Sequence, residues 1–308
     1  MANWSEVLQQ IQSVQAQGQQ LQARANDVVR HNYLKALHEK TGRNVIAYYS
    51  GFLSKQVGGV EINDEDKNGF MMAVHKLDRS KGLDLIIHTP GGNISSTQSI
   101  VDYLHKMFDR NVRAIVPQIA MSAGTMLACS CKEIWMGKHS NLGPIDPHIN
   151  GIPAYGVLSE FREACKQVKD DPSKIPIWQS IIGQYRPTFL SRCENAIEWS
   201  NSFVRQQLTE IMFAGQQDAK TKADAIVEKL TDFTGNKTHE RHIHFEECFE
   251  MGLNVKSIEN DAASDKGFQD LVLTVHHCYM HVFMNSRSYK AIENHVGGGI
   301  FKQLVAQQ

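Results

Sequence analysis

Ser122 is the residue whose surroundings point most clearly to covalent chemistry. It lies in the segment AMSAGT, residues 120–125, after an apolar run that predicts a buried strand and at the start of a predicted helix of small residues. A serine at such a junction is close to the positive end of the helix dipole, and the following amide can stabilise an oxyanion. The alternative is a serine that only caps the helix, and the choice between the two depends on the neighbouring segments.

A glycine loop follows the preceding predicted strand. The segment TPGG, residues 89–92, comes directly after the apolar run 83–88, which is typical of a strand buried on both faces. Pro90 fixes its own φ, while Gly91 and Gly92 can adopt backbone shapes closed to other residues and let a substrate approach their amides. An oxyanion hole requires such amides, although an ordinary strand-to-helix turn would use the same residues. Because neighbouring parallel strands end at the same edge of a sheet, we expect this loop and Ser122 to flank one crevice.

Two further polar segments contain candidates for a general base. The segment NLGPIDPH, residues 141–148, holds Asp146 between an apolar residue and a proline, which stiffens its backbone. His148 ends this segment and is either a base or an ordinary loop residue. The segment THERHIH, residues 238–244, precedes a short predicted helix.

The histidines of the second segment have a spacing that could hold a metal ion. They stand at i, i+3 and i+5, as His239, His242 and His244. No cysteine or carboxylate cluster elsewhere in the sequence completes a site, so we expect no metal. The glycines at 297–299 lack the context of a phosphate-binding loop, and we expect no cofactor.

Alternating strands and helices must position these residues. Their regular alternation in the first half of the chain predicts an α/β core with a mainly parallel sheet. Strands are expected at 45–49, 83–88, 112–119 and 133–136, and helices at 64–77 and 95–108. The second half is expected to be mostly helical, with segments at 153–168, 175–214 (broken near Pro187), 221–230, 245–251 and 262–284, and one strand at 254–258.

The two ends of the chain differ from this core. Residues 3–30 show a heptad pattern, which predicts one amphipathic helix. The pattern is formed by Trp4, Val7, Ile11, Val14, Gly18, Leu21, Ala25 and Val28. Such a helix serves either in oligomerisation or partner docking, or lies on its own domain. The glycines at 297–299 predict a hinge in a flexible tail.

Composition excludes several classes of function. The 308 residues are 42% hydrophobic and carry a formal net charge of −1, so we expect a substantial core and no nucleic-acid partner. No apolar stretch approaches the ~18 residues that a membrane span needs. The six cysteines form no C-x-x-C pair, which favours reduced, buried thiols and a cytoplasmic location.

Taken together, the motifs in residues 43–258 resemble the serine dehydrogenase proteinase family, a relative of Clp protease and signal peptide peptidase A. The resemblance is carried by LIIHTPGG at 85–92, VP at 116–117, AMSAGTM at 120–126, LGPIDP at 142–147, TH at 238–239 and GLNV at 252–255. It implies a Clp/crotonase-like superfold of stacked ββα units with a mainly parallel sheet. We therefore expect an N-terminal helical extension at 1–42, a hydrolase core at 43–260 with a helical insertion at about 153–232, and a C-terminal helix and tail at 261–308.

The resemblance also implies roles for individual residues. Ser122 would be the nucleophile of a serine peptidase that works through an acyl-enzyme. The oxyanion amides would come from Gly91, Gly92 and Ala123. Matching by position places Asp146 near the Clp histidine and His239 near the Clp aspartate, so the two roles look exchanged. A Ser122–His239–Asp146 triad would preserve the chemistry, because triads are recognised by geometry and not by chain order.

Other interpretations remain open from the sequence. Relatives of signal peptide peptidase use a lysine base, for which Lys166 and Lys169 lie at a suitable distance along the chain, although their polar neighbours indicate exposure. His148 is a further candidate base. We expect a peptide or protein substrate and a homo-oligomer. The alternative function is a catalytically silent oligomeric scaffold of the same fold. Acyl-CoA chemistry has less support from the sequence, because no adenine-binding signature is evident.

Overall fold

A seven-stranded mixed sheet forms the centre of the protein. The computed structural model describes residues 4–16, 22–149, 151–232, 238–259 and 266–305. The strand order is β10-β5-β3-β2-β1-β11-β12, and the first five of these strands are parallel. Their bounds are β10 (Val255–Ser257), β5 (Ile134–Met136), β3 (Val112–Val116), β2 (Leu83–His88), β1 (Asn44–Ser50), β11 (Ser288–Asn294) and β12 (Gly299–Gln303). The predicted α/β fold with a mostly parallel sheet is confirmed.

The central strands are apolar because both of their faces are covered. In β1, Ile46 and Tyr48 pack into the core on one side of the sheet, while Val45, Ala47 and Tyr49 pack into the core on the other side. Successive side chains of a strand point to opposite faces. A strand buried on both faces therefore reads as a nearly continuous apolar run, which is why the sequence identified these strands.

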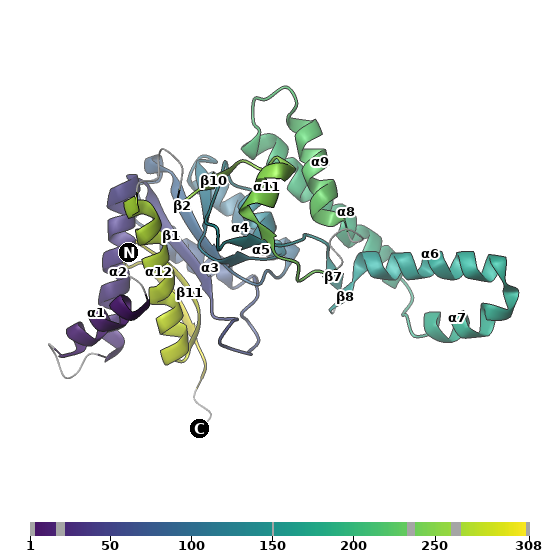
Figure 1. The fold of residues 1–308 in the computed structure, drawn as a ribbon, viewed down its shortest axis with the longest axis horizontal. Helices are drawn as coiled ribbons and strands as arrows, with labels where there is room; N and C mark the ends of the chain where they lie inside the picture. Colours follow the sequence, from purple (N-terminus) through teal and green to yellow (C-terminus); the bar gives the residue numbers. More distant parts are fainter. Residues whose placement is uncertain (1–3, 17–21, 150, 233–237, 260–265, 306–308) are drawn as a thin grey trace.

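Helices cover both faces of the sheet (Figure 1). The core on one face is completed by α3 (Asp66–Val74), α4 (Ile94–Met107), α5 (Ala123–Cys129), α8 (Phe189–Gln207), α9 (Ala219–Thr231) and α11 (Phe245–Met251). The other face is covered by α2 (Gln22–Thr41) and α12 (Lys266–Asn285), which lie side by side. The three-layer arrangement leaves the ends of the strands, and not the faces, available for a site.

The N-terminal segment differs from the single heptad helix that its pattern predicts. It contains two helices, α1 (Trp4–Ala16) and α2, and the expected seam positions Gly18 and Leu21 lie outside the described residues. Val7 and Ile11 of α1 are buried against α2 and Cys278 of α12. The buried position near the end of the heptad pattern is also displaced by one residue, because Val29 is buried while Val28 is 46% exposed. This apolar face is thus covered by the chain itself.

The predicted flexible tail is instead a β-hairpin. Strands β11 and β12 are antiparallel, and β11 extends the sheet by pairing with β1. Gly297 has a φ of +86° in the turn, and the Asn294 side chain accepts hydrogen bonds from the amides of Val296 and Gly298, each at 2.9 Å. The sequence pattern of β11 does not indicate a buried strand because it contains Lys290. This lysine is fully buried, and its ammonium is paired with Asp66. The proposed division of the chain into three segments stays a prediction.

A helical arm projects from the core (Figure 1). It follows the short hairpin β7 (His148–Ile149) and β8 (Ile152–Pro153), and it consists of α6 (Ala154–Asp170), α7 (Ile175–Ile182) and the first half of α8. The predicted break near Pro187 lies between α7 and α8. Ala154, Val157 and Cys193 form a separate small core that joins α6 to α8. In the described part of the chain, every helix is too short or too polar to span a membrane.

Candidate active site

A second, three-stranded sheet gathers the predicted catalytic residues. Its order is β4-β6-β9, with β4 (Ile119–Ala120) parallel to β6 (Asn141–Leu142), and β9 (Ile243–His244) antiparallel to β6. Ser122 closely follows β4, Asp146 closely follows β6, and His239 closely precedes β9. Because β9 runs in the opposite direction, the start of β9 and the ends of β4 and β6 lie at the same edge.

Ser122 occupies an unusual backbone conformation between β4 and α5. Its φ is 53° and its ψ is −118°, and its side chain makes no capping hydrogen bond to the helix. A positive φ at a non-glycine residue costs about 1–3 kcal/mol and is retained where the surroundings enforce it. Here the turn is held by the Gly124 amide, which donates to the Met121 carbonyl at 2.7 Å. Ser122 therefore does not act as a helix cap, and its strained turn is typical of a nucleophile presented at a strand end.

Gly91 packs directly against the turn that contains Ser122. A Cβ atom on Gly91 would lie 2.8 Å from the Cβ of Ser122 and 2.6 Å from the carbonyl oxygen of Met121. The φ of Gly91 is also +99°. Only glycine fits this position, and the glycine loop and the serine turn are consequently in contact.

The amides of this region differ in their availability. The Gly91 N–H donates to the Thr89 hydroxyl at 3.2 Å. The structure gives the N–H groups of Gly92 and Ala123 no acceptor among the described residues. Gly92 is fixed by Ile62, whose carbonyl accepts from the Asn93 amide at 2.9 Å and whose N–H donates to the Gly91 carbonyl at 2.7 Å. Of these three amides, only that of Gly91 thus has a hydrogen-bond acceptor among the described residues.

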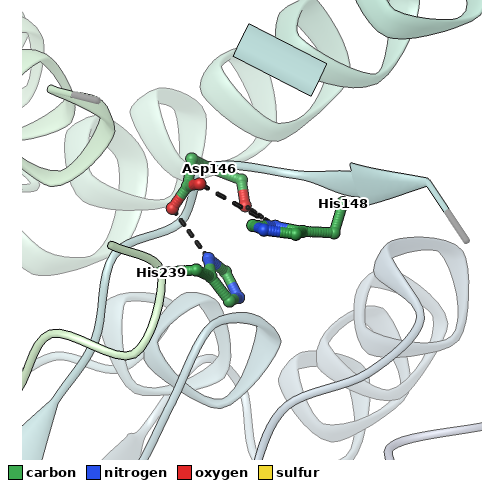
Figure 2. A group of neighbouring side chains, drawn as sticks. All are labelled: Asp146, His148 and His239. Carbon is green, nitrogen blue, oxygen red and sulfur yellow. Dashed lines mark hydrogen bonds and ion pairs between the residues drawn. The ribbon is translucent and has the colours of Figure 1, made fainter. Parts of the chain in front are cut away.

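Asp146 and His239 form a direct pair (Figure 2). Nδ1 of His239 lies 2.7 Å from Oδ1 of Asp146, and the two side chains are 25% and 5% exposed. This is the contact by which a carboxylate orients a catalytic imidazole. The described residues contain no hydrogen bond between Ser122 and His239.

Thr125 connects the serine helix with the loop that carries Asp146. The Gly143 amide donates to the Thr125 hydroxyl at 2.9 Å, and further along this loop the Ser200 hydroxyl donates to the carbonyl of Ile145 at 2.8 Å. The sequence assigned no role to Thr125 or to Ile62. The presence of a β-branched hydroxyl residue in a helix of small residues was the available signal for Thr125, whereas Ile62 gave none because its contact with the glycine loop joins distant parts of the chain.

His148 faces the same carboxylate as His239 (Figure 2). Its Nδ1 lies 3.8 Å from Oδ2 of Asp146, and its ring centroid lies 4.1 Å from that of His239. Burial, together with the neighbouring His239, lowers the pKa of His148. These three residues bring their donor atoms to within 4.8 Å of one another, so they could also hold a metal ion.

The remaining candidates lie away from this cluster. Lys166 and Lys169 are exposed on α6, whereas a catalytic lysine needs burial to become a base. His242 and His244 are exposed and do not join His239. The metal grouping present among the described residues is therefore not the one that the spacing of 238–244 indicated.

Comparisons with known proteins agree with the motifs. A family model described as "ClpP-like SDH-type serine proteinase" matches residues 16–262. The uncharacterized protein MJ0137 of Methanocaldococcus jannaschii is 29% identical over 240 residues, which cover 77% of this chain and 76% of that protein. The uncharacterized protein MJ1495 of the same organism is 28% identical over 196 residues, covering 64% of this chain and 59% of that protein.

Solved structures include the ClpP protease catalytic domain from Plasmodium falciparum. It has 12% sequence identity to this chain and a TM-score of 0.36, covering 67% of this chain and 85% of that one. The family model spans most of the chain and confirms the resemblance inferred from the motifs. The chain belongs to the ClpP-like SDH-type serine proteinase family.

Proposed function

We propose that this chain is a serine peptidase that cleaves peptide bonds through an acyl-enzyme on Ser122. The observation that carries the proposal is the strained turn of Ser122, packed on Gly91 at the same sheet edge as the Asp146–His239 pair. A strained serine without a capping role has no evident structural purpose. Two amides without an acceptor among the described residues and an imidazole oriented at the same sheet edge would give it a chemical one.

In this mechanism His239 is the general base. Its Nε2 takes the proton of the Ser122 hydroxyl as the oxygen attacks the carbonyl carbon, and the same proton is then given to the leaving amine. Asp146 accepts a hydrogen bond from Nδ1 and stabilises the imidazolium, in keeping with the 2.7 Å contact. Water repeats the sequence and releases the acyl group. Hydrogen bonds between nucleophile and base are often long in the absence of substrate, so we expect the contact between Ser122 and His239 to form on binding.

The amides of Gly92 and Ala123 are the donors that we assign to the oxyanion hole. Their N–H groups are available, whereas the Gly91 N–H is engaged by Thr89. Gly91 contributes space, because any side chain there would collide with Ser122. One such donor is worth roughly 10²–10³ in rate.

The other candidate bases receive less support. Lys166 and Lys169 are exposed, and His148 lies farther from the Asp146 carboxylate than His239 does. Loss of turnover in His148→Gln together with retained turnover in His239→Gln would transfer the role of base to His148.

We further propose a homo-oligomer in the cytoplasm. The arm carries apolar side chains that the chain leaves uncovered, including Ile175 at 47% and Ile177 at 62% exposure. Large exposed apolar groups of this kind are typical of subunit contacts. All six cysteines are free thiols, as expected in a reducing compartment. Light scattering tests the assembly, and a monomer at micromolar concentration would refute it.

The nucleophile is tested by covalent labelling. We expect a fluorophosphonate probe to label the protein, and Ser122→Ala to lose both the label and peptide hydrolysis. Ser202→Ala is the matched control, because Ser202 is an exposed serine on α8 and its loss should change neither readout. Persistent labelling of Ser122→Ala would exclude Ser122 as the nucleophile, and an unlabelled, inactive wild-type protein would favour the silent scaffold.

A further inference from the structure

Asp146, His148 and His239 direct three potential metal ligands toward one small volume (Figure 2). Nδ1 of His239 is 2.7 Å from one carboxylate oxygen of Asp146, and Nδ1 of His148 is 3.8 Å from the other. Two ligands of a tetrahedral Zn²⁺ ion, at bond lengths of about 2.0–2.1 Å, lie about 3.4 Å apart. These two separations end on different oxygens of the carboxylate, and the donor atoms of all three residues lie within 4.8 Å of one another, so a contraction of the cluster around one ion would bring them to the tetrahedral spacing.

Two of these ligands come from one short, stiff segment. Asp146 and His148 are separated by Pro147, and residues at i and i+2 of an extended chain project to the same side. The Pro147 carbonyl accepts from the Ala154 amide at 3.0 Å, and His148 pairs with Pro153 in the β7–β8 hairpin. His239 supplies the third ligand from the segment before β9. The arrangement is therefore held before any ion binds.

The chemistry of the donors selects the class of ion. Two imidazole nitrogens and one carboxylate oxygen suit Zn²⁺ and similar transition metals, whereas Ca²⁺ and Mg²⁺ prefer oxygen ligands throughout. Three protein ligands leave a fourth position for water. His148 and His239 are 23% and 25% exposed, so an ion can enter from solvent.

We propose that Asp146, His148 and His239 form a Zn²⁺ site, and that the bound ion switches off the peptidase. The second half rests on the proposed function. When the ion binds Nδ1 of His239, the single proton of the neutral ring is transferred through solvent to Nε2. An Nε2–H is a donor and cannot accept the proton of Ser122. The ion also takes the carboxylate of Asp146, so the nucleophile loses both its base and the group that orients the base.

Metal binding is tested separately from activity. The full chain carrying Ser122→Ala is titrated with Co²⁺, whose visible absorption reports tetrahedral coordination by nitrogen and oxygen, and Zn²⁺ is then used to displace the Co²⁺. We expect one saturable site per chain. His148→Gln and His239→Gln, each in that background and checked for folding by circular dichroism, should weaken binding at least about tenfold, since even outer-shell partners of a metal contribute that much.

Two control variants address other surface ligands. His242→Gln removes an exposed histidine outside the cluster, and Cys165→Ser removes the exposed thiol; neither should change the affinity. Equal affinity in the parent, His148→Gln and His239→Gln proteins would overturn the site, as would the absence of saturable binding.

The regulatory half is tested on the wild-type protein. Zn²⁺ should suppress both fluorophosphonate labelling and peptide hydrolysis, and a chelator should restore both. Full turnover with Zn²⁺ bound would overturn the inhibitory role. Because binding is measured in Ser122→Ala, failure of the peptidase proposal would leave the binding result intact, and the two failures can be distinguished.

Discussion

Two buried carboxylates, those of Asp66 and Asp146, each face two basic side chains, but their partners differ in kind. Asp66 is fully buried and pairs with Lys290 at 2.9 Å and Lys302 at 3.0 Å. Asp146 is nearly as buried and faces the imidazoles of His148 and His239. The first cluster joins α3 to the β11–β12 hairpin, whereas the second lies at the edge of the small sheet beside Ser122.

The difference shows how the partner decides what a buried carboxylate can do. Asp66 also accepts hydrogen bonds from the Tyr48 hydroxyl at 2.7 Å and the Asn63 amide at 3.1 Å, so its oxygens are fully engaged with fixed donors. Such a group holds elements in place. An imidazole can be neutral, donate, accept or bind a metal. Asp146 therefore belongs to an arrangement that can change state, and the Asp66 cluster does not.

The largest effect that would separate the two clusters is loss of turnover in Asp146→Asn. We expect kcat to fall by about 10⁴, because an amide stabilises the wrong tautomer of the histidine. The midpoint of thermal unfolding should change little, since Asn is nearly isosteric. The measurement is kcat for a peptide substrate alongside the unfolding curve. Unchanged kcat would remove Asp146 from the catalytic machinery and erase the proposed contrast.

The second prediction concerns the Asp66 cluster, where a substitution should lower the free energy of unfolding without affecting the reactivity of Ser122. Lys290→Met removes a fully buried cation from Asp66, and breaking a buried pair costs about 3–5 kcal/mol. Urea unfolding measures the loss, while fluorophosphonate labelling of the folded protein should persist. Lys302→Met is the control, because Lys302 retains some exposure to solvent and its loss should cost less. Equal free energies of unfolding for wild type and Lys290→Met would show that the Asp66–Lys290 pair does not contribute to stability.

The buried pair of Asp66 and Lys290 also explains why some strands could be predicted from the sequence and another could not. Strands such as β1 and β2 are recognisable because both faces are apolar. β11 was missed because the charge of Lys290 is neutralised by Asp66, which lies far away in the sequence. Long-range compensation of this kind leaves no local signal.

The candidate site shows a similar limit. Ser122 and the glycine loop could be proposed from the sequence because each follows a recognisable apolar run, 112–119 and 83–88. The structure divides the first run into β3 and β4, which belong to different sheets. Strands β4, β6 and β9 have only two residues each, too few to show a period, so the edge that they share could not be derived from pattern. The approach of His148 to His239 likewise depends on chain reversals, and the metal-ligand grouping appeared only in three dimensions.

The third prediction concerns the pH dependence of stability that results from His88, a buried imidazole whose hydrogen-bond partners are a backbone carbonyl and an amide side chain. His88 is fully buried, with Nδ1 at 3.0 Å from the Ser50 carbonyl oxygen and Nε2 at 3.1 Å from Oε1 of Gln118. Burial lowers its pKa from 6.5 to about 4. Between these pH values the unfolded chain binds a proton that the folded chain does not, so the free energy of unfolding should fall by about 3 kcal/mol as the pH decreases.

The variant His88→Asn should flatten this acid dependence. Urea unfolding at pH 7 and near pH 4.5 measures the slope for both proteins, and the difference between them isolates His88 from the carboxylates that also titrate. His75→Asn is the control, since His75 is exposed. An identical slope in wild type and His88→Asn would show that burial without a carboxylate partner does not impose the expected cost.

The smallest effect comes from an ion pair that is not buried at all. Arg205 on α8 contacts Asp224 on α9, and their side chains are 38% and 47% exposed. Water already solvates both charges, so Asp224→Asn should cost only about 0.2–1 kcal/mol, and added salt should reduce the difference further. Urea unfolding at low and high salt provides the measurement. A loss as large as that of Lys290→Met would mean that burial does not set the strength of these pairs, because the chemical groups are similar and solvent exposure is the main difference between them.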